Sequence, residues 1–210
     1  MSQIPALPEG RHVFQTSDLV ALGFNRRGVE RLLGEGKIIH PTFGGNGPEM
    51  TLWVTPDAEA DPDLPEAAVC LLTGGVLCRG YAAVRHGLSN DTAGRMELAI
   101  PYEKNPGRRP YLLTHRTKDP RVLAVGIEEI PTELGVPIRI TGPARTIVDL
   151  LRSRGRVGEE WRHGIDALRA YLGQGGDTEA LYDMARTFDP GLVKIIETAA
   201  ESFNGGGFRP

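Results

Sequence analysis

A short segment near the N-terminus gathers basic and amide side chains at close spacing: Asn25, Arg26, Arg27, Glu30 and Arg31. Arginine can donate two parallel hydrogen bonds to guanine, and one such contact favours the correct base by about 1–3 kcal/mol. Asparagine at a helix start can cap the helix or contact a phosphate. In a helix-turn-helix, the first residues of the second helix meet base edges in the major groove. The segment is therefore a candidate for sequence-specific contact with double-stranded DNA.

Two helices are predicted to position this segment. Hydroxyl and carboxyl side chains at 16–18 precede a short apolar run that ends at Gly23, which is the usual pattern of a helix start and stop. A second helix is expected over 26–36, with one apolar stripe formed by Val29, Leu32 and Leu33. The arginines project from its other faces. Thr16 and Ser17, at the start of the first helix, join the candidate DNA contacts.

A β-hairpin is predicted to follow the second helix. Strand-like segments at 37–43 and 50–55 flank a turn at 44–49 that contains three glycines and a proline. Lys37 and His40 lie at the base of this hairpin and are candidate phosphate contacts. Two helices followed by a hairpin are the element order of a winged helix-turn-helix.

The charge distribution limits any nucleic-acid site to a local surface. The chain has 24 basic and 27 acidic residues, a net charge of −3, and its first 56 residues balance five bases against five acids. A protein that coats nucleic acid is normally more basic. Residues 57–66 carry five acids and no base, a composition that marks an exposed connection. The sequence predicts a winged helix-turn-helix DNA-binding domain over 1–56, an acidic proline-rich connection over 57–66 and a second domain over 67–210.

The second domain is predicted to be a mixed α/β unit that ends in helices. Alternating apolar residues indicate strands at 96–101, 111–114 and 136–141. Helical spacing and capping signals indicate helices at 64–72, 80–88, 143–152, 159–172, 178–188 and 190–202. The whole chain is accordingly assigned to the α+β class.

Catalysis is not expected from these residues. A nuclease would need clustered carboxylates to hold Mg²⁺, and the nearest set is Asp91, Glu97, Glu103 and Lys104. Glu103 and Lys104 are adjacent, so they do not share a strand face. Three histidines that could act as bases lack a serine or cysteine nucleophile motif: His86, His115 and His163. A nuclease is therefore a third hypothesis, which metal binding would revive.

No cofactor, metal site or membrane segment is expected. The glycines at 44–47 lack the lysine and following helix of a phosphate loop. Cys70 and Cys78 are too few for a zinc site or a disulfide framework. The apolar run at 67–78 is shorter than the roughly 20 residues that span a bilayer, and the N-terminus lacks a secretory signal. A reduced, cytoplasmic protein is expected.

Several motifs between residues 12 and 152 resemble the AbiEi family of type IV antitoxins. Two lie in the N-terminal unit, Ser17-Asp18-Leu19 and Leu32-Leu33-Gly34-Glu35-Gly36-Lys37-Ile38. Two lie in the second domain, Ala82-Ala83-Val84-Arg85-His86-Gly87-Leu88 and Arg145-Thr146-Ile147-Val148-Asp149, of which the last is the most specific. One departure is the second strand, which reads Leu52-Trp53-Val54 where many relatives end in Gly-x-Tyr.

The resemblance implies a DNA-binding repressor that acts on the operator of its own operon. It also implies an antitoxin of an abortive infection system that counteracts a nucleotidyltransferase-like toxin without forming a stable complex with it. The signature residues Arg145, Thr146 and Asp149 are expected to be structural. Arg145 and Asp149 lie one helical turn apart and can pair, or Arg145 can bond to a strand carbonyl instead.

A protein-interaction module is the second hypothesis. In it the winged helix is structural, and the second domain engages a partner through its basic residues, eleven against eight acids over 67–149. The state of the recognition helix separates the two hypotheses. If Arg26, Arg27 and Arg31 are held in intramolecular salt bridges, the hypothesis of DNA binding is weakened.

Overall fold

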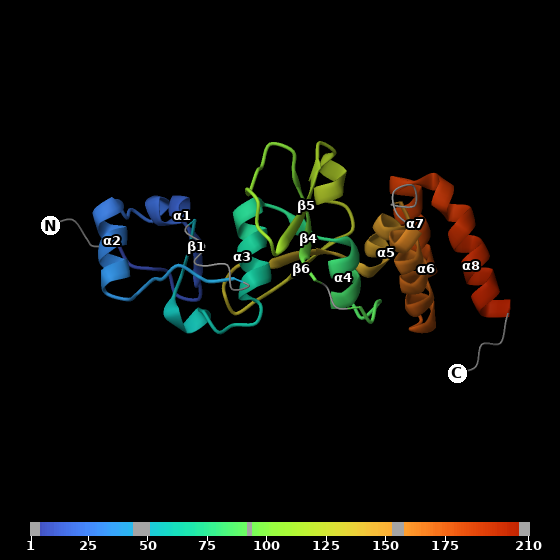
Figure 1. Ribbon diagram of the computed structural model, residues 1–210, viewed down its shortest axis with the longest axis horizontal. Helices are drawn as coiled ribbons and strands as arrows, with labels where there is room; N and C mark the ends of the chain where they lie inside the picture. The colour runs from blue at the N-terminus through green and yellow to red at the C-terminus, as the bar shows by residue number, and fades with distance from the viewer. Residues whose placement is uncertain (1–4, 44–50, 92–93, 153–157, 206–210) are drawn as a thin grey trace.

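The computed structural model describes residues 5–43, 51–91, 94–152 and 158–205. The chain is elongated, with two short helices of the N-terminal unit at one end, a sheet in the middle and a group of helices at the other end (Figure 1). The fold is mixed α+β, as the sequence predicts. No helix within the described ranges is long and apolar enough to cross a membrane.

The N-terminal unit contains β1 (Val13–Gln15), α1 (Thr16–Ala21), α2 (Arg26–Gly34) and β2 (Leu52–Val54). β1 pairs antiparallel with β2, and Ile39 forms a single bridge to Val54. Both predicted helices are confirmed. The strand expected over 37–43 is wrong as a regular ladder, because only isolated bridges form there and Pro41 has no N–H to donate. The predicted turn over 44–49 lies outside the described residues.

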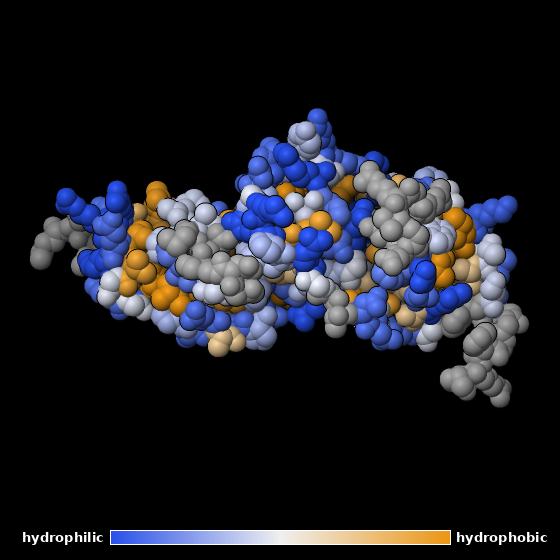
Figure 2. Space-filling view, in the orientation of Figure 1, coloured by the Kyte–Doolittle hydropathy of each residue, from blue (hydrophilic) through white to orange (hydrophobic). Residues whose placement is uncertain are grey.

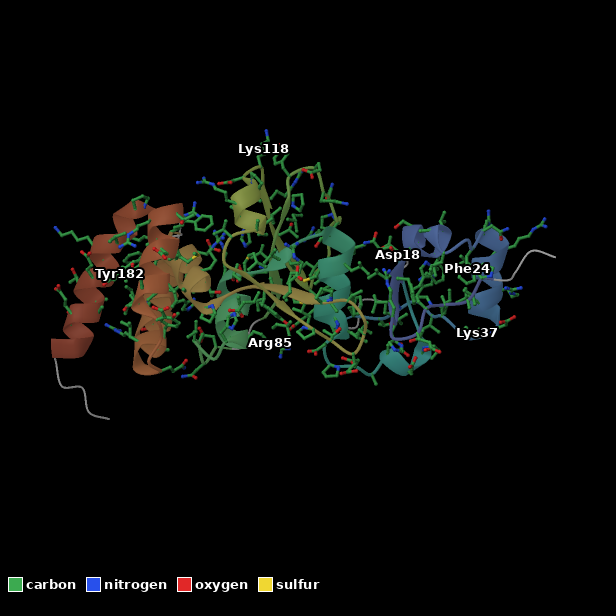
Figure 3. The ribbon with its side chains drawn as sticks, turned by 180° about the vertical axis from the view of Figure 1, so that it is seen from behind. Asp18, Phe24, Lys37, Arg85, Lys118 and Tyr182 are labelled. Carbon is green, nitrogen blue, oxygen red and sulfur yellow. The ribbon has the colours of Figure 1, made fainter. Side chains whose placement is uncertain are left out.

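A small apolar cluster holds α1 and α2 against the strands. Its buried members are Phe14, Leu19, Phe24, Leu32 and Ile38. Phe24 lies between the two helices (Figure 3). It directly follows Gly23, whose φ of +91° lets the chain turn sharply from α1 toward α2. The predicted stop signal at Gly23 therefore reflects a backbone conformation that other residues rarely adopt.

Both helices of the unit begin at hydrogen-bonded caps. Asn25 Oδ1 accepts a hydrogen bond from the Gly28 amide at 3.0 Å, which confirms Asn25 as the cap of α2. The cap of α1 is Gln15 rather than one of residues 16–18. The reason is that Asp18 Oδ2 accepts the Gln15 amide at 2.8 Å, so the carboxylate reaches back by three residues.

The middle of the molecule is a five-stranded sheet in the order β5-β4-β3-β7-β6. Its strands are β3 (Val76–Leu77), β4 (Met96–Pro101), β5 (Leu112–Thr117), β6 (Ile127–Ile130) and β7 (Ile138–Thr141). β4 runs parallel to β5 and β3 parallel to β7, whereas the β3–β4 and β6–β7 pairs are antiparallel. The three predicted strands are confirmed, with shifted ends at β5 and β7. β3 and β6 are additional.

Helix α3 (Leu64–Thr73) joins the N-terminal unit to the sheet. Its apolar residues share one buried cluster with the sheet and with four residues of the N-terminal unit, Val13, Phe43, Leu52 and Val54. Gln15 Nε2 also donates to the Leu71 carbonyl at 2.5 Å. The short helical turn η1 (Pro56–Ala58) lies between β2 and α3. The small N-terminal unit therefore shares its core with the rest of the chain.

The loop before β7 contacts the start of the N-terminal unit so closely that only glycine fits. Gly135 has a φ of +71°, and a Cβ there would collide with the Gly10 carbonyl oxygen. We expect Gly135→Ala to lower the free energy of unfolding by more than about 2 kcal/mol, because the collision adds to the roughly 1–2 kcal/mol cost of a left-handed alanine. Urea unfolding measures the loss.

Gly36→Ala is the matched control for this prediction. Gly36 has a φ of +65°, and its Cβ would meet no described atom within 4 Å. This variant therefore carries the backbone cost without the collision. Equal losses of unfolding free energy in the two variants would contradict a tight junction at Gly135.

Four helices form the other end of the molecule: α5 (Pro143–Arg152), α6 (Gly158–Gly173), α7 (Thr178–Phe188) and α8 (Val193–Gly205). They confirm the predicted helices, although a short turn, η4 (Pro190–Leu192), precedes α8. Their buried cluster includes Ile147, Leu150 and Leu151, which share one face of α5. Helix α4 (Arg79–Arg85) contributes Ala83 to the same cluster.

Both cysteines are buried and form no disulfide. Burial raises the pKa of the Cys70 thiol to about 11 and raises the pKa of the Cys78 thiol as well. We expect neither thiol to react with a thiol-specific reagent near about pH 8 in the folded protein, because the thiolate is the reactive form. Both should react in urea. Equal labelling rates with and without urea would contradict this placement.

Candidate nucleic-acid interface

Helix α2 lies at one end of the molecule (Figure 1). The two arginines of its first turn, Arg26 and Arg27, are exposed. The Arg26 side chain is 92% exposed, and its Nε lies 2.8 Å from Glu30 Oε1. Arg27 is exposed as well and has no ion-pair partner among the residues that the structure describes. The N-terminal end of α2 therefore carries one arginine paired with a neighbour on its own helix and one arginine without an acidic partner.

The C-terminal end of α2 carries a shared carboxylate. Glu35 lies 3.8 Å from Arg31 Nε and 2.8 Å from Lys37 Nζ, and all three side chains are exposed. The hydrogen bond from Lys37 is the largest influence on the pKa of Glu35 and lowers it. Burial raises this pKa by a smaller amount, and the charges of Lys37 and Arg31 lower it further. Glu35 therefore stays ionised at neutral pH and neutralises part of this cation pair.

Trp53 brings together two of the predicted contacts. Its Nε1 donates to Thr16 Oγ1 at 3.1 Å, and its ring centroid lies 4.0 Å from that of His40. His40 Nδ1 lies 2.9 Å from the Leu52 carbonyl oxygen, to which it donates. Ser17 is exposed beside Thr16. Sequence reasoning did not include Trp53, although strand alternation directs it away from its two buried neighbours.

Arg145 is buried in α5 and fully engaged. Its side chain is 1% exposed, and its Nε lies 3.0 Å from Asp149 Oδ2. Its Nη1 donates to the Val125 carbonyl oxygen at 2.6 Å, and its guanidinium lies 3.7 Å from the Phe188 ring centroid. The helical pair and the carbonyl contact that the sequence left as alternatives are therefore both present. Together they tie α5 to the segment before β6 and to α7.

Thr146 connects α5 to the sheet. Its Oγ1 lies 2.7 Å from Thr141 Oγ1 and 3.0 Å from the Thr141 carbonyl oxygen, and both residues are buried. The three signature residues lie on the side of the sheet next to the terminal helices, whereas α2 lies at the opposite end (Figure 1). The predicted site residues therefore form two separate groups, one mostly exposed around α2 and one mostly buried in α5.

An open cleft of about 710 Å³ lies beside α4, β4 and α6. Asp91 and His163 line it with their side chains 3.4 Å apart, and Glu97 lines it while pairing with His115 at 3.1 Å. Glu103 lines a different cavity. Within the described ranges, no group of three or more histidine, cysteine or acidic side chains is placed to hold a metal ion. The carboxylates considered for a nuclease are thus divided between two surfaces.

No family model matches this sequence, and no curated protein matches it. Among solved structures, the chain is similar to the crystal structure of the Rv2827c protein from Mycobacterium tuberculosis, with a TM-score of 0.52 and 17% sequence identity. The match covers 93% of this chain and 73% of the other. At this identity, the likeness shows that the two proteins share a mixed α+β fold.

Proposed function

We propose that the N-terminal unit is a winged helix that binds double-stranded DNA with α2 in the major groove. The observation that carries this proposal is the exposed first turn of α2, capped by Asn25 and bearing Arg26 and Arg27 at one end of the chain. Base edges are contacted from this turn in helix-turn-helix proteins. Thr16, Ser17, Lys37 and His40 are the proposed contacts to the phosphates on either side of the groove.

The salt bridges on α2 are compatible with this function. Arg26 and Arg31 pair with acids on their own helix, which counts against a DNA site, whereas Arg27 has no such partner among the described residues. The Arg26–Glu30 pair is highly exposed, and pairs of this kind contribute about 0.3–0.5 kcal/mol. A bidentate contact to guanine discriminates by about 1–3 kcal/mol, so DNA can displace Glu30 from Arg26.

The wider role that we propose is a cytoplasmic transcriptional repressor and antitoxin of a type IV system. Its support is the resemblance of the Arg145–Asp149 signature and the N-terminal motifs to the AbiEi family. The repressor binds the operator of its own operon. The antitoxin counteracts a nucleotidyltransferase-like toxin without a stable complex between the two proteins.

Fluorescence anisotropy with the full chain tests the DNA-binding part. The probe is a duplex from the chain's own promoter, compared with a scrambled duplex of equal length and base composition. The proposal expects tighter binding to the promoter and affinity that falls as salt rises, because phosphate contacts release counterions. Equal affinity for the two duplexes across the salt series would contradict specific binding.

The antitoxin part is tested in cells by co-expression with the neighbouring nucleotidyltransferase-like gene product. Rescue of growth by this chain, together with the absence of a stable complex on size-exclusion chromatography, is the expected result. Continued growth arrest at matched expression would contradict the antitoxin role. Rescue accompanied by a stable complex would contradict the proposed mode of action.

A protein-interaction module remains the second candidate because of two exposed apolar side chains. Val20 on α1 is 61% exposed and Leu33 on α2 is 41% exposed. In the alternative drawn from the sequence, the winged helix is structural and the second domain engages the partner. These two exposed side chains extend that alternative to a protein contact on α1 and α2 themselves. A Val20→Ser/Leu33→Ser variant that keeps full promoter affinity would count against it.

A further inference from the structure

The central part of the chain contains a strongly basic segment that the proposed function does not use. Residues 102–121 hold six basic side chains against two acidic ones, a local charge of 6 − 2 = +4 in a chain of net charge −3. Hydrophilic residues cover the upper part of the central region in Figure 2. Lys118 projects outward there, well away from α2 (Figure 3).

The sheet topology brings the two ends of this segment together. β4 and β5 are parallel, and Pro101 at the end of β4 is in register with Thr117 at the end of β5. Tyr102 and Lys118, which directly follow these residues, therefore emerge side by side from the carboxyl ends of two neighbouring strands. Arg116 is fixed to the same point, because its Nε donates to the Tyr102 carbonyl oxygen at 2.8 Å.

An exposed aromatic ring lies beside both cations. Tyr102 is 48% exposed. The Arg116 Cζ and the Lys118 Nζ each lie 4.5 Å from its ring centroid, a distance at which a cation is attracted to the ring face. Both cations are thus in contact with the same ring.

Neither of these cations is neutralised by a carboxylate in the described part of the chain. The neighbouring Arg121 differs, because it pairs with Asp119 at 2.7 Å. The hydrogen bond from Arg121 lowers the pKa of Asp119, so this carboxylate is already ionised and engaged. Arg116 and Lys118 are therefore available to an external anion.

A cavity of about 380 Å³ opens beside the same ring. Tyr102, Lys118 and the ring of Pro120 line it, together with Glu103 and Asp119. This volume lies at the lower end of the range for small-ligand pockets. The acidic side chains disfavour a phosphate inside the cavity, so its lining favours an uncharged planar group over a charged one.

We propose that Tyr102, Arg116 and Lys118 form a binding surface for single-stranded nucleic acid. Aromatic rings that stack bases beside cations that hold the backbone are the two components of such surfaces. A duplex keeps its bases stacked internally and cannot offer one to Tyr102. An acidic protein surface would use the cations but leave the ring and the cavity empty. The surface is separate from α2 and does not depend on binding of the promoter.

The test measures binding of fluorescein-labelled oligouridine of about 12 nucleotides to the full chain. Arg116→Gln/Lys118→Gln is expected to weaken binding at least about tenfold and to flatten its salt dependence. Tyr102→Leu is expected to weaken it by about tenfold while leaving the salt dependence unchanged, because stacking involves no counterion release. Thermal unfolding of each variant establishes that it is folded.

Arg162→Gln/Lys194→Gln is the matched control, since it removes two exposed cations on α6 and α8. It should bind oligouridine as the wild type does. Equal weakening by the control, or unchanged binding in Tyr102→Leu, would overturn the proposal. Competition by polyglutamate as strong as by unlabelled oligouridine would overturn it in favour of an acidic protein partner. An Arg26→Ala/Arg27→Ala variant should retain oligouridine binding. The oligouridine measurement and the promoter measurement therefore test the two proposals independently.

Discussion

Arg145→Met is expected to lower the free energy of unfolding by about 3–5 kcal/mol, the usual cost of breaking a buried ion pair. Asp149 would lose its closest cation, at 3.0 Å, and the Val125 carbonyl would lose its donor, at 2.6 Å. The stacking contact with Phe188 would disappear as well. Methionine fills part of the volume, and Asp149 keeps its contact with Arg152 at 3.6 Å, so the loss reports mainly on the hydrogen bonds that Arg145 makes. Urea unfolding followed by circular dichroism measures it.

Arg162→Met is the control for this measurement, because Arg162 lies exposed on α6. Surface substitutions of this kind change the unfolding free energy by about 0.5 kcal/mol or less. Asp149→Asn is a second variant, which keeps an acceptor near Arg145 but removes the charge. A loss in Arg145→Met no larger than in Arg162→Met would contradict a structural role for the signature.

The second large effect concerns DNA. Arg26→Ala/Arg27→Ala is expected to weaken binding of the promoter duplex by at least about tenfold, since a single bidentate base contact is worth about 1–3 kcal/mol. Discrimination between the promoter and a scrambled duplex should fall with it. Anisotropy titrations at one fixed salt concentration measure both quantities. Both side chains are exposed, so the variant should keep the stability of the wild type.

The chain offers a control with the same local chemistry. Arg169 is exposed and pairs with Asp166 on α6, as Arg26 pairs with Glu30 on α2, and Arg162 is exposed on the same helix. Arg162→Ala/Arg169→Ala therefore removes an equal charge from a similar environment. If both double variants weaken promoter binding equally, the effect is general electrostatics and the assignment of α2 is wrong.

Local signals in the sequence predicted the helices well. Asn25 and Gly23 delimit α2 and α1 through contacts and backbone angles that involve only nearby residues. The face formed by Ile147, Leu150 and Leu151 follows from spacing alone. The fold class could be predicted from such signals because each signal involves only residues within about four positions of one another along the chain.

The short strands could not be predicted in the same way. β1 and β3 have three and two residues, too few for an alternating pattern. β6 places Glu128 and Glu129 between its two isoleucines, which hides its pairing with β7. These strands form because strands distant in the sequence supply their hydrogen bonds. The residues of each short segment do not indicate which distant strand it pairs with.

The candidate site residues also divide into those whose placement local sequence predicts and those whose placement depends on distant contacts. Arg26 and Arg27 lie about 120–140° around α2 from Leu32, the member of the predicted apolar stripe that is buried, so their exposure follows from helical spacing. Leu33 of the same stripe is 41% exposed, so the stripe is narrower than the sequence predicts. The burial of Arg145 does not follow from helical spacing, because its carbonyl partner comes from the segment before β6 and its ring partner from α7. Trp53 joins Thr16 and His40 only after β2 has paired with β1.

Site-directed cleavage of DNA tests the central claim that α2 lies in the major groove. Gly34→Cys places a thiol at the end of α2 where a Cβ meets no described atom within 4 Å, and the two native thiols are buried. An iron chelate attached there should cut the promoter duplex at one short, defined position. The same chelate on Thr198→Cys, exposed on α8, should not. Cleavage that is absent, or identical from both positions, would contradict the account.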